Sequence, residues 1–384
     1  MTRWRWAAAA FGLLAAGCAE PFPPGWTYVT RVDQTAATLV WTGADGGRVT
    51  CRSGTGTPVT AAGTARGRNL VAARLERLLP GTRYTCRVLT SDGQRLTRLD
   101  FRTAPPDDAS FLFTVVGDSG HGGPVAKAIA RRIRAAHPAF LIHVGDFAYS
   151  HATVHEMDTR FFPQYRATLA RVPLFPTPGN HDLFNRSVYR SLFAPAVDGD
   201  AADGFRYHFH WGPGAFVSLS SPDGARGAPG LADDLAAGGT LPWRIVFLHE
   251  PLYTAGHKRV ERGLRAGLGP VVETAGVDLV LAGHQHFYER SLPSCEFVPS
   301  ARVLHVTSGG GSASDLDPVR EHPNFPFAAS TPHFLRVRVR PDRIEVRAVG
   351  ADGHTIDRMR RLRSEDPGCR ADGWPRQHSR QRMW

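Results

Sequence analysis

The sequence contains almost no lysine. Lys127 and Lys258 are the only two in a chain whose 46 basic residues outnumber its 35 acidic ones and give a net charge of +11. The arginines are scattered and become dense only in RMRRLR at residues 358–363. A nucleic-acid-binding surface usually combines clustered positive charge with interleaved aromatic residues, and the sequence has no such strip. We therefore expect no nucleic-acid partner, despite the positive charge.

Long hydrophobic runs are also lacking. The first apolar segment, residues 7–16, is too short to span a bilayer as a helix, and no later segment is long enough. It follows two arginines and precedes small residues, which is the arrangement of an export signal. LAAGC at residues 14–18 resembles a bacterial lipobox, although Ala15 stands where such motifs prefer Leu. We expect residues 1–18 to direct export, with Cys18 either lipidated at the bacterial cell envelope or part of the plain signal peptide of a secreted protein.

Cysteine is scarce, with five residues in the chain. If Cys18 carries a lipid, Cys51, Cys86, Cys295 and Cys369 remain. An even number of cysteines in an oxidising compartment permits two disulfides. Sequence separation favours Cys51–Cys86 and Cys295–Cys369, but three connectivities are open, and so are free thiols.

The first part of the chain reads as an all-β domain. Residues 27–104 consist of short alternating segments separated by turn clusters such as GADGG, LPGT and SDGQ. Several short strands at regular spacing predict a β-sandwich. LERLLPGTRYTCRV resembles the end of a fibronectin type III domain, and this resemblance makes Tyr84 the corner tyrosine. A spacer at 19–26 precedes the expected domain and a linker at 105–110 follows it.

From residue 111 the pattern changes. Apolar segments of strand length, such as FLFTVV, AFLIHV, WRIVFL and VDLVLA, alternate with helical segments such as PVAKAIARRIRAAH. This alternation predicts βαβ units around a buried sheet, and therefore an α/β domain over residues 111–358. Further strands are expected at FRYHFHW, AFVSLS, VLHVTS, HFLRVRVR and IEVRAV. A basic C-terminal tail is expected at 359–384, and its part after Asp366 lacks periodicity.

Five apolar segments end directly in polar residues, usually after a glycine. The endings are GDSG (117–120), GDFAY (145–149), GNHD (179–182), HEPLY (249–253) and GHQH (283–286). In an open α/β sheet, ligands gather at the carboxyl ends of strands because the loops converge there. One such ending alone is more often an ordinary turn, but five in one order are hard to obtain by chance. We expect them to bring seven donors to one rim, namely Asp118, Asp146, Tyr149, Asn180, His249, His284 and His286.

Seven oxygen and nitrogen donors, three of them able to be anionic, are too many for one small cation and suit two. A pair of cations about 3.5–4 Å apart, shared by a bridging carboxylate, is the arrangement used for in-line displacement at phosphorus. The sequence therefore predicts a dinuclear centre that hydrolyses phosphate esters.

The set of endings also resembles the five sequence blocks of the purple acid phosphatases, within the calcineurin-like metallophosphoesterase superfamily. The resemblance covers residues 111–310. A typical superfamily member has Asp-x-His in the first block and Asp at the end of the second. This chain has Gly120 and Tyr149 at these two positions, which is the purple acid phosphatase pattern. The resemblance implies an α+β sandwich for the catalytic domain, and the N-terminal β domain is similar to one found in the larger members.

The resemblance assigns the donors to two metals. The ferric ion, Fe(III), is expected to be held by Asp118, Asp146, Tyr149 and His286. A divalent Zn, Fe or Mn ion is expected to be held by Asp146, Asn180, His249 and His284, with Asp146 bridging. Metal chemistry agrees, because a hard trivalent ion prefers anionic oxygen whereas imidazole suits the divalent ions.

Two further histidines receive catalytic roles from the resemblance. His181 is expected to hydrogen-bond the phosphate, and His257 to protonate the leaving alkoxide or orient the phosphate, although a surface histidine is the alternative for His257. The expected reaction is the attack of a metal-bound hydroxide on a phosphorylated small molecule, a phosphate monoester. Hydrolysis of phosphodiesters or nucleotides remains open, and so does a degenerate cell-surface binding protein.

Overall fold

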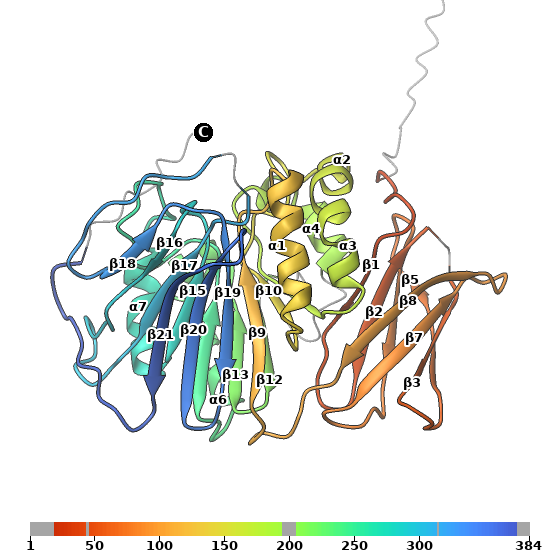
Figure 1. Ribbon diagram of the computed structural model, residues 1–384, viewed down its shortest axis with the longest axis horizontal. Coiled ribbons are helices and arrows are strands. Elements are labelled where there is room, and N and C mark those ends of the chain that lie inside the picture. Colours follow the sequence, from red (N-terminus) through yellow and green to blue (C-terminus); the bar gives the residue numbers. More distant parts are fainter. Residues whose placement is uncertain (1–18, 44–45, 194–204, 313–314, 375–384) are drawn as a thin grey trace, which may run out of the picture.

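The computed structural model describes residues 19–43, 46–193, 205–312 and 315–374. The expected export signal with Cys18 lies outside the described residues, as do residues 375–384. The described part consists of a β-sandwich beside a larger α/β domain (Figure 1). None of its helices combines the length and the apolar character needed to cross a membrane.

The N-terminal sandwich contains two four-stranded antiparallel sheets. The first has the order β1-β2-β6-β5, with bounds Thr27–Thr30, Ala37–Thr42, Leu70–Leu75 and Thr64–Ala65. The second has the order β4-β3-β7-β8, with bounds Val59–Ala62, Arg48–Arg52, Arg83–Leu89 and Arg95–Arg102. Every second side chain of β7 is buried, as expected for a strand with one face on a core. The predicted β-sandwich is confirmed.

Two predicted features of the sandwich are present. Cys51 and Cys86 are partners in the β3–β7 register and form a disulfide. The Tyr84 hydroxyl accepts a hydrogen bond from the backbone N–H of Leu79 at 2.9 Å, which is the contact of a corner tyrosine.

The larger domain is built on two sheets. The first has the order β11-β10-β9-β19-β20-β21, with bounds Leu174–Pro176, Leu141–His143, Phe111–Val116, His333–Val339, Arg343–Gly350 and Thr355–Leu362. The second has the order β12-β13-β14-β15-β17-β16-β18, with bounds Tyr207–Trp211, Gly214–Ser218, Trp243–Phe247, Leu279–Ala282, Leu304–Ser308, Tyr288–Arg290 and Phe327–Ala329. Strands β9–β11 run parallel, and so do β13, β14, β15 and β17.

The two sheets pack face to face through an apolar core. Phe113 of the first sheet meets Phe216 of the second edge to face, with ring centroids 5.4 Å apart. Helices cover the outer faces of the parallel strands, so central strands such as β15 are buried on both sides. This is why these strands read as continuous apolar runs in the sequence. The predicted α/β sandwich is confirmed.

The helices form two groups (Figure 1). Those beside the first sheet are α1 Gly123–Ala135, α2 Val154–Glu156, α3 Phe162–Leu169 and α4 Arg186–Phe193, with the short helices η1 Met157–Phe161 and η2 Asp182–Asn185. Those beside the second sheet are α5 Ser221–Ala225, α6 Leu231–Ala236 and α7 Leu264–Thr274. The first group also meets the sandwich, where Trp26 stacks on Phe162 with ring centroids 4.0 Å apart.

The end of the chain differs from the prediction. Residues 359–362 belong to strand β21, so the α/β domain does not end at residue 358. The strand was missed because its apolar residues, Ile356, Met359 and Leu362, are three positions apart and give no period-two alternation. Beyond β21, Cys369 forms a disulfide with Cys295, as sequence separation favoured, and Trp374 is buried.

Candidate metal centre

The five predicted endings follow five strands of the two sheets. GDSG, GDFAY and GNHD follow the parallel strands β9, β10 and β11, whereas HEPLY and GHQH follow the parallel strands β14 and β15. Because parallel strands end at one edge of a sheet, and the two sheets face each other, the endings converge. All seven side chains expected as metal ligands lie in one cluster of direct contacts.

The first part of the cluster is rich in oxygen. The Tyr149 hydroxyl lies 3.2 Å from Asp118 Oδ1 and 3.0 Å from His286 Nε2. The same His286 nitrogen lies 3.2 Å from Asp118 Oδ1. These three side chains thus meet pairwise within hydrogen-bonding distance, and all three residues are buried.

The second part is rich in imidazole. Asn180 Oδ1 lies 3.1 Å from His249 Nε2 and 3.0 Å from His284 Nδ1. Asp146 Oδ2 lies 3.4 Å from the same His249 nitrogen. Ligand atoms of Asp118, Asp146 and His249 lie within 4.8 Å of one another, so Asp146 joins the two parts.

The imidazoles are aimed by hydrogen bonds on their far nitrogens. His249 Nδ1 contacts the Val144 carbonyl at 2.7 Å, and His284 Nε2 contacts the Arg259 carbonyl at 2.6 Å. His286 Nδ1 contacts the Asp315 carboxylate at 2.9 Å. Because these oxygens only accept, each ring donates to them and turns its other nitrogen toward the cluster. This is the orientation that metal-ligating histidines adopt.

The glycines in the endings make room for the cluster. A Cβ at residue 179 would lie 2.1 Å from Asp146 Oδ1, and a Cβ at residue 145 would lie 2.6 Å from His249 Nδ1. Asp118, Asp146 and His284 themselves have φ values of 58°, 58° and 69°, a region that non-glycine residues rarely occupy. Such conformations cost of order 1–3 kcal/mol each and concentrate at functional sites.

The charges of the cluster fit bound cations. Asp118 and Asp146 are buried, and no Lys or Arg in the described part of the chain pairs with either carboxylate. Burial alone would raise the pKa of Asp146, yet the adjacent His249 holds it below its usual range. Burial alone would lower the pKa of His249, but Asp146 outweighs it and raises that pKa to about 9. These buried carboxylates need a nearby positive charge, which protonated imidazoles supply here. A bound metal cation can supply the same charge instead of the protons.

The Tyr149 phenol is held in its neutral form by its surroundings. Burial, followed by the charge of Asp118, raises the pKa of Tyr149 well above its usual value near 10. A phenolate at this position therefore needs a strong positive charge next to its oxygen. A bound trivalent cation supplies such a charge, because a cation that contacts an acidic group lowers the pKa of that group.

His181 borders the open side of the cluster. Its Nδ1 lies 2.5 Å from the Ser150 carbonyl, and its Nε2 lies 4.0 Å from Asp146 Oδ2. It helps to line a pocket of about 260 Å³ beside Tyr149, Asn180, His284 and His286. The structure therefore places His181 next to the cluster, as expected.

His257 is placed differently from the expectation. It does not line this pocket, and its Nε2 lies 3.8 Å from Asp317 Oδ1 with 39% of the side chain exposed. The adjacent Lys258 does line the pocket, with its Nζ 3.2 Å from Asp317 Oδ2. Sequence reasoning missed Lys258, although its being one of only two lysines was a signal.

Asp182, the last residue of GNHD, was also missed. Its Oδ2 accepts from the N–H groups of Asp146 at 2.7 Å and Gly179 at 2.8 Å, and its Oδ1 accepts from Phe147 at 3.1 Å. It thereby ties the β10 ending to the β11 ending. Its position inside GNHD was the only sequence feature that pointed to Asp182. Residue type does not reveal that a side chain acts through hydrogen bonds to distant backbone groups.

The amino-acid sequence is similar to those of known phosphoesterases. Residues 111–288 match the family described as Calcineurin-like phosphoesterase. Human acid phosphatase type 7 is 31% identical over 303 residues, which are 66% of this chain and 67% of the human protein. Purple acid phosphatase 15 of Arabidopsis thaliana is 24% identical over 286 residues, which are 63% of this chain and 54% of that protein. The chain thus spans between half and two thirds of the length of these relatives.

A solved structure shares the whole architecture. The purple acid phosphatase PPD1 from yellow lupin (Lupinus luteus) seeds superposes with a TM-score of 0.75 at 17% sequence identity. The superposition covers 89% of this chain and 75% of the lupin chain. This likeness shows the common fold, with a β-sandwich ahead of the α/β domain. The sequence matches establish that this chain belongs to the purple acid phosphatase and acid phosphatase type 7 family of calcineurin-like metallophosphoesterases.

Proposed function

We propose that the protein hydrolyses phosphate monoesters at a centre of two cations. The observation that carries the proposal is the division of the seven side chains into two contacting parts joined by one carboxylate. The oxygen-rich part is Asp118, Tyr149 and His286, the imidazole-rich part is Asn180, His249 and His284, and Asp146 lies between them.

The chemistry of each part suggests its metal. The oxygen-rich part, with a phenol that needs a strong positive charge, suits Fe(III), and the imidazole-rich part suits a divalent Zn, Fe or Mn ion. When bound, two such cations supply positive charge to the phosphoryl group and lower the pKa of a coordinated water. In this proposal Asp146 bridges the two, since it contacts His249 and shares the buried triad with Asp118.

In the same proposal His181 holds the phosphate of the substrate. The Ser150 carbonyl can only accept, so His181 Nδ1 donates to it and Nε2 faces the pocket. A protonated His181 then donates from Nε2 to a phosphate oxygen, whereas the neutral ring offers only an acceptor there. Phosphate binding by this residue therefore depends on its proton.

Lys258 and His257 divide the remaining work in the proposal. Lys258 places a positive charge on the pocket wall, where it attracts the phosphate, and His257 protonates the leaving alkoxide. Asp317 holds both side chains, at 3.2 Å from Lys258 Nζ and 3.8 Å from His257 Nε2. Since His257 does not line the pocket, a shift toward the substrate is part of this assignment.

Leaving-group chemistry tests the two roles. para-Nitrophenolate leaves without a proton, whereas the alkoxide of glycerol 2-phosphate requires one. His257→Ala should therefore lower kcat much more for glycerol 2-phosphate than for para-nitrophenyl phosphate. Lys258→Ala should raise KM for both substrates by a similar factor. Equal losses of kcat on both substrates in His257→Ala would remove the acid role.

Metal analysis with a visible spectrum tests the centre itself. Two metal ions per chain are expected, with a charge-transfer band from Tyr149 phenolate on Fe(III). Tyr149→Phe should abolish the band. Tyr253→Phe is the matched control, because Tyr253 is equally buried and bonds Glu296 instead of the cluster. Loss of the band in Tyr253→Phe as well, or its persistence in Tyr149→Phe, would contradict the ligand assignment.

Substrate assays separate the alternatives within and beyond the family. para-Nitrophenyl phosphate should be hydrolysed faster than its bis-ester, and the reverse order would favour a phosphodiesterase. Purified protein that contains no metal, and that does not take it up, would favour a surface binding protein.

We also propose export, because the two disulfides are bonds of an oxidising compartment. Lipid anchoring is tested by Cys18→Ser, which should move a lipidated protein from the membrane fraction to the soluble one. An unchanged distribution would indicate a plain signal peptide.

A further inference from the structure

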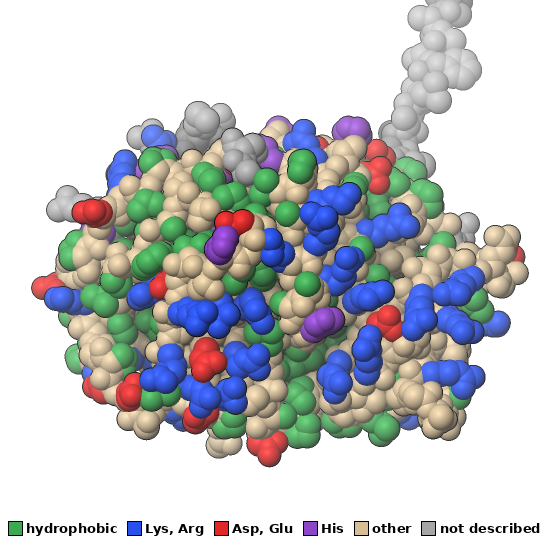
Figure 2. All heavy atoms as spheres, in the orientation of Figure 1, with side chains coloured by type: hydrophobic (Ala, Val, Ile, Leu, Met, Phe, Trp, Pro, Cys, Tyr) green, Lys and Arg blue, Asp and Glu red, His purple; other side chains and the backbone are tan. Residues whose placement is uncertain are grey.

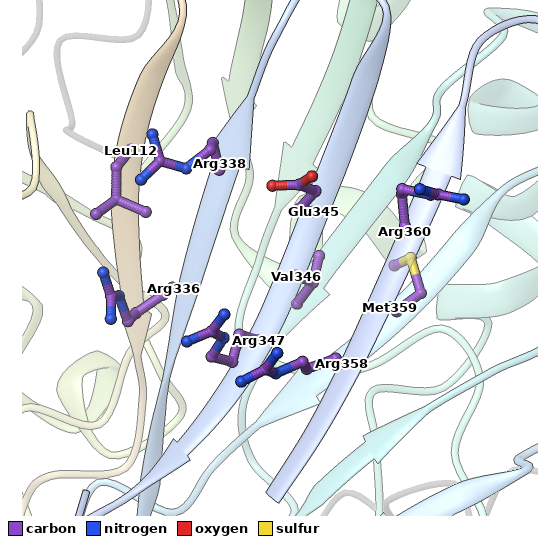
Figure 3. A pocket seen from close by; sticks show the side chains of 9 residues that line it. All are labelled: Leu112, Arg336, Arg338, Glu345, Val346, Arg347, Arg358, Met359 and Arg360. Atoms are coloured by element: carbon purple, nitrogen blue, oxygen red, sulfur yellow. The ribbon is translucent and has the colours of Figure 1, made fainter. Parts of the chain in front are cut away.

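The outer face of the C-terminal strands carries a second, unrelated group of charges. Five arginines from β19, β20 and β21 surround a hollow of about 570 Å³, which Leu112, Glu345, Val346 and Met359 also line. The arginines are Arg336, Arg338, Arg347, Arg358 and Arg360 (Figure 3). The space-filling view shows Lys and Arg side chains gathered on the face over these strands (Figure 2).

Strand register brings like charges directly opposite each other. Arg336 of β19 pairs with Arg347 of β20, and Arg347 pairs with Arg358 of β21. Three guanidinium groups therefore form a ladder across three neighbouring strands. Partial burial, followed by the charges of Arg347 and Arg338, lowers the pKa of Arg336. Like charges at directly opposite positions destabilise a sheet, so this ladder opposes folding.

The five guanidinium groups form no ion pairs among the described residues, although Glu345 is the cross-strand partner of Arg338 and Arg360. Within the described part of the chain, none of them lies within 4.0 Å of a carboxylate oxygen, whereas nearby Arg343 and Arg361 both form ion pairs. Glu345, the one acid of the hollow, is engaged by Arg343 at 3.0 Å. The hollow thus has five positive side chains and one negative side chain, which leaves an excess of positive charge.

We propose that this hollow binds a compact anion that carries several phosphate groups. Guanidinium groups match phosphate oxygens in paired hydrogen bonds, and several of them on a rigid sheet match several phosphates at once. A volume of about 570 Å³ has the size of a small-molecule site. No aromatic side chain lines it, so the stacking that holds single-stranded nucleic acid is missing among the described residues.

The hollow is separate from the metal centre. Leu112 lies near the start of β9, whereas Asp118 follows the end of the same strand. Binding in the hollow therefore does not depend on the proposed phosphatase reaction, and the two are tested independently.

The test uses myo-inositol hexasulfate, whose sulfate groups reproduce the charges but are not phosphate esters. Titration calorimetry of the full protein is carried out at low salt and without added phosphate, because free phosphate would compete for the same guanidinium groups. The arginine variants then separate binding in the hollow from any binding at the metal centre. We expect one binding event per chain that weakens as salt is raised. Arg347→Gln with Arg358→Gln should lower the affinity at least about tenfold, because two charge-assisted contacts are lost.

A matched double variant serves as the control. Arg87 and Arg98 are also cross-strand partners, in the sandwich sheet, but do not line the hollow. Arg87→Gln with Arg98→Gln removes the same charge and should leave the affinity within about twofold. Hydrolysis of para-nitrophenyl phosphate should be unchanged in both double variants.

Three outcomes would overturn the proposal. One is the absence of hexasulfate binding at low salt, and another is equal weakening in both double variants. The third is binding to vesicles of phosphatidylglycerol that depends on Arg347 and Arg358 while hexasulfate does not bind. That result would indicate a membrane-facing surface in place of a compact ligand site.

Discussion

Asp182 offers the sharpest test of how the metal centre is held in place. The buried carboxylate accepts three backbone hydrogen bonds, from Asp146, Phe147 and Gly179. Asp182→Ala removes all three acceptors and leaves the N–H groups in a buried site. At about 1–3 kcal/mol for each unsatisfied donor, and with partial relaxation, the free energy of unfolding should fall by about 3–6 kcal/mol. Metal content should fall too, because the β10 and β11 endings are no longer tied together.

Asp182→Asn is the graded variant. Its amide oxygen can keep the contacts of Oδ2 with Asp146 and Gly179, while its amide nitrogen opposes the N–H of Phe147. The expected loss is about 1–3 kcal/mol, that of one unsatisfied donor.

The control for both variants is Asp33→Ala. Asp33 accepts from two backbone N–H groups at 2.7 Å each but is 46% exposed, so water replaces its carboxylate. We expect a loss of about 1 kcal/mol there. Urea unfolding followed by circular dichroism gives the stabilities, and elemental analysis gives the metal content. If Asp182→Ala costs no more than Asp33→Ala and retains both metals, the tie between the two endings is not important.

Three further predictions concern stability. Burial raises the pKa of Glu289 from 4.5 to about 7, so the folded state binds more protons than the unfolded state between these values and stability falls as pH rises through them. Glu289→Gln should remove about 2 kcal/mol of this pH dependence, as measured by urea unfolding at pH 5 and pH 7. Replacing Cys295 and Cys369 by Ser opens a loop with a sequence separation of 74 and should lower stability by about 4 kcal/mol, relative to the same protein with the bond intact. Arg347→Gln relieves repulsion from Arg336 and Arg358 and should raise stability by about 0.2–1 kcal/mol, whereas a lower melting temperature would contradict the ladder argument.

The convergence of the seven side chains could be predicted because it depends on short sequence patterns. Each of the five endings joins an apolar strand to a polar residue within a few positions, and strand direction then forces convergence at one rim. The fold class followed from the same alternation, since buried parallel strands need continuous apolar runs and crossover helices between them. Sequence separation favoured the two disulfides, and the resemblance to a fibronectin type III domain pointed to Tyr84 as the corner tyrosine.

What escaped prediction depends on contacts between distant segments. β21 gives no apolar alternation because it lies at the edge of its sheet, and its arginines face a charged ladder that only strand register creates. Asp182 accepts from backbone N–H groups of the ending that follows β10, about 35 residues away, and residue type does not predict such a bond. Lys258 and His257 are neighbours in sequence, yet only Lys258 lines the pocket, because the path of a loop decides which side chain faces inward. The sequence by itself therefore determined which side chains follow the strand ends and meet at one edge of the sheets. The tertiary structure decided how these side chains are oriented, because their orientation depends on contacts between the two sheets.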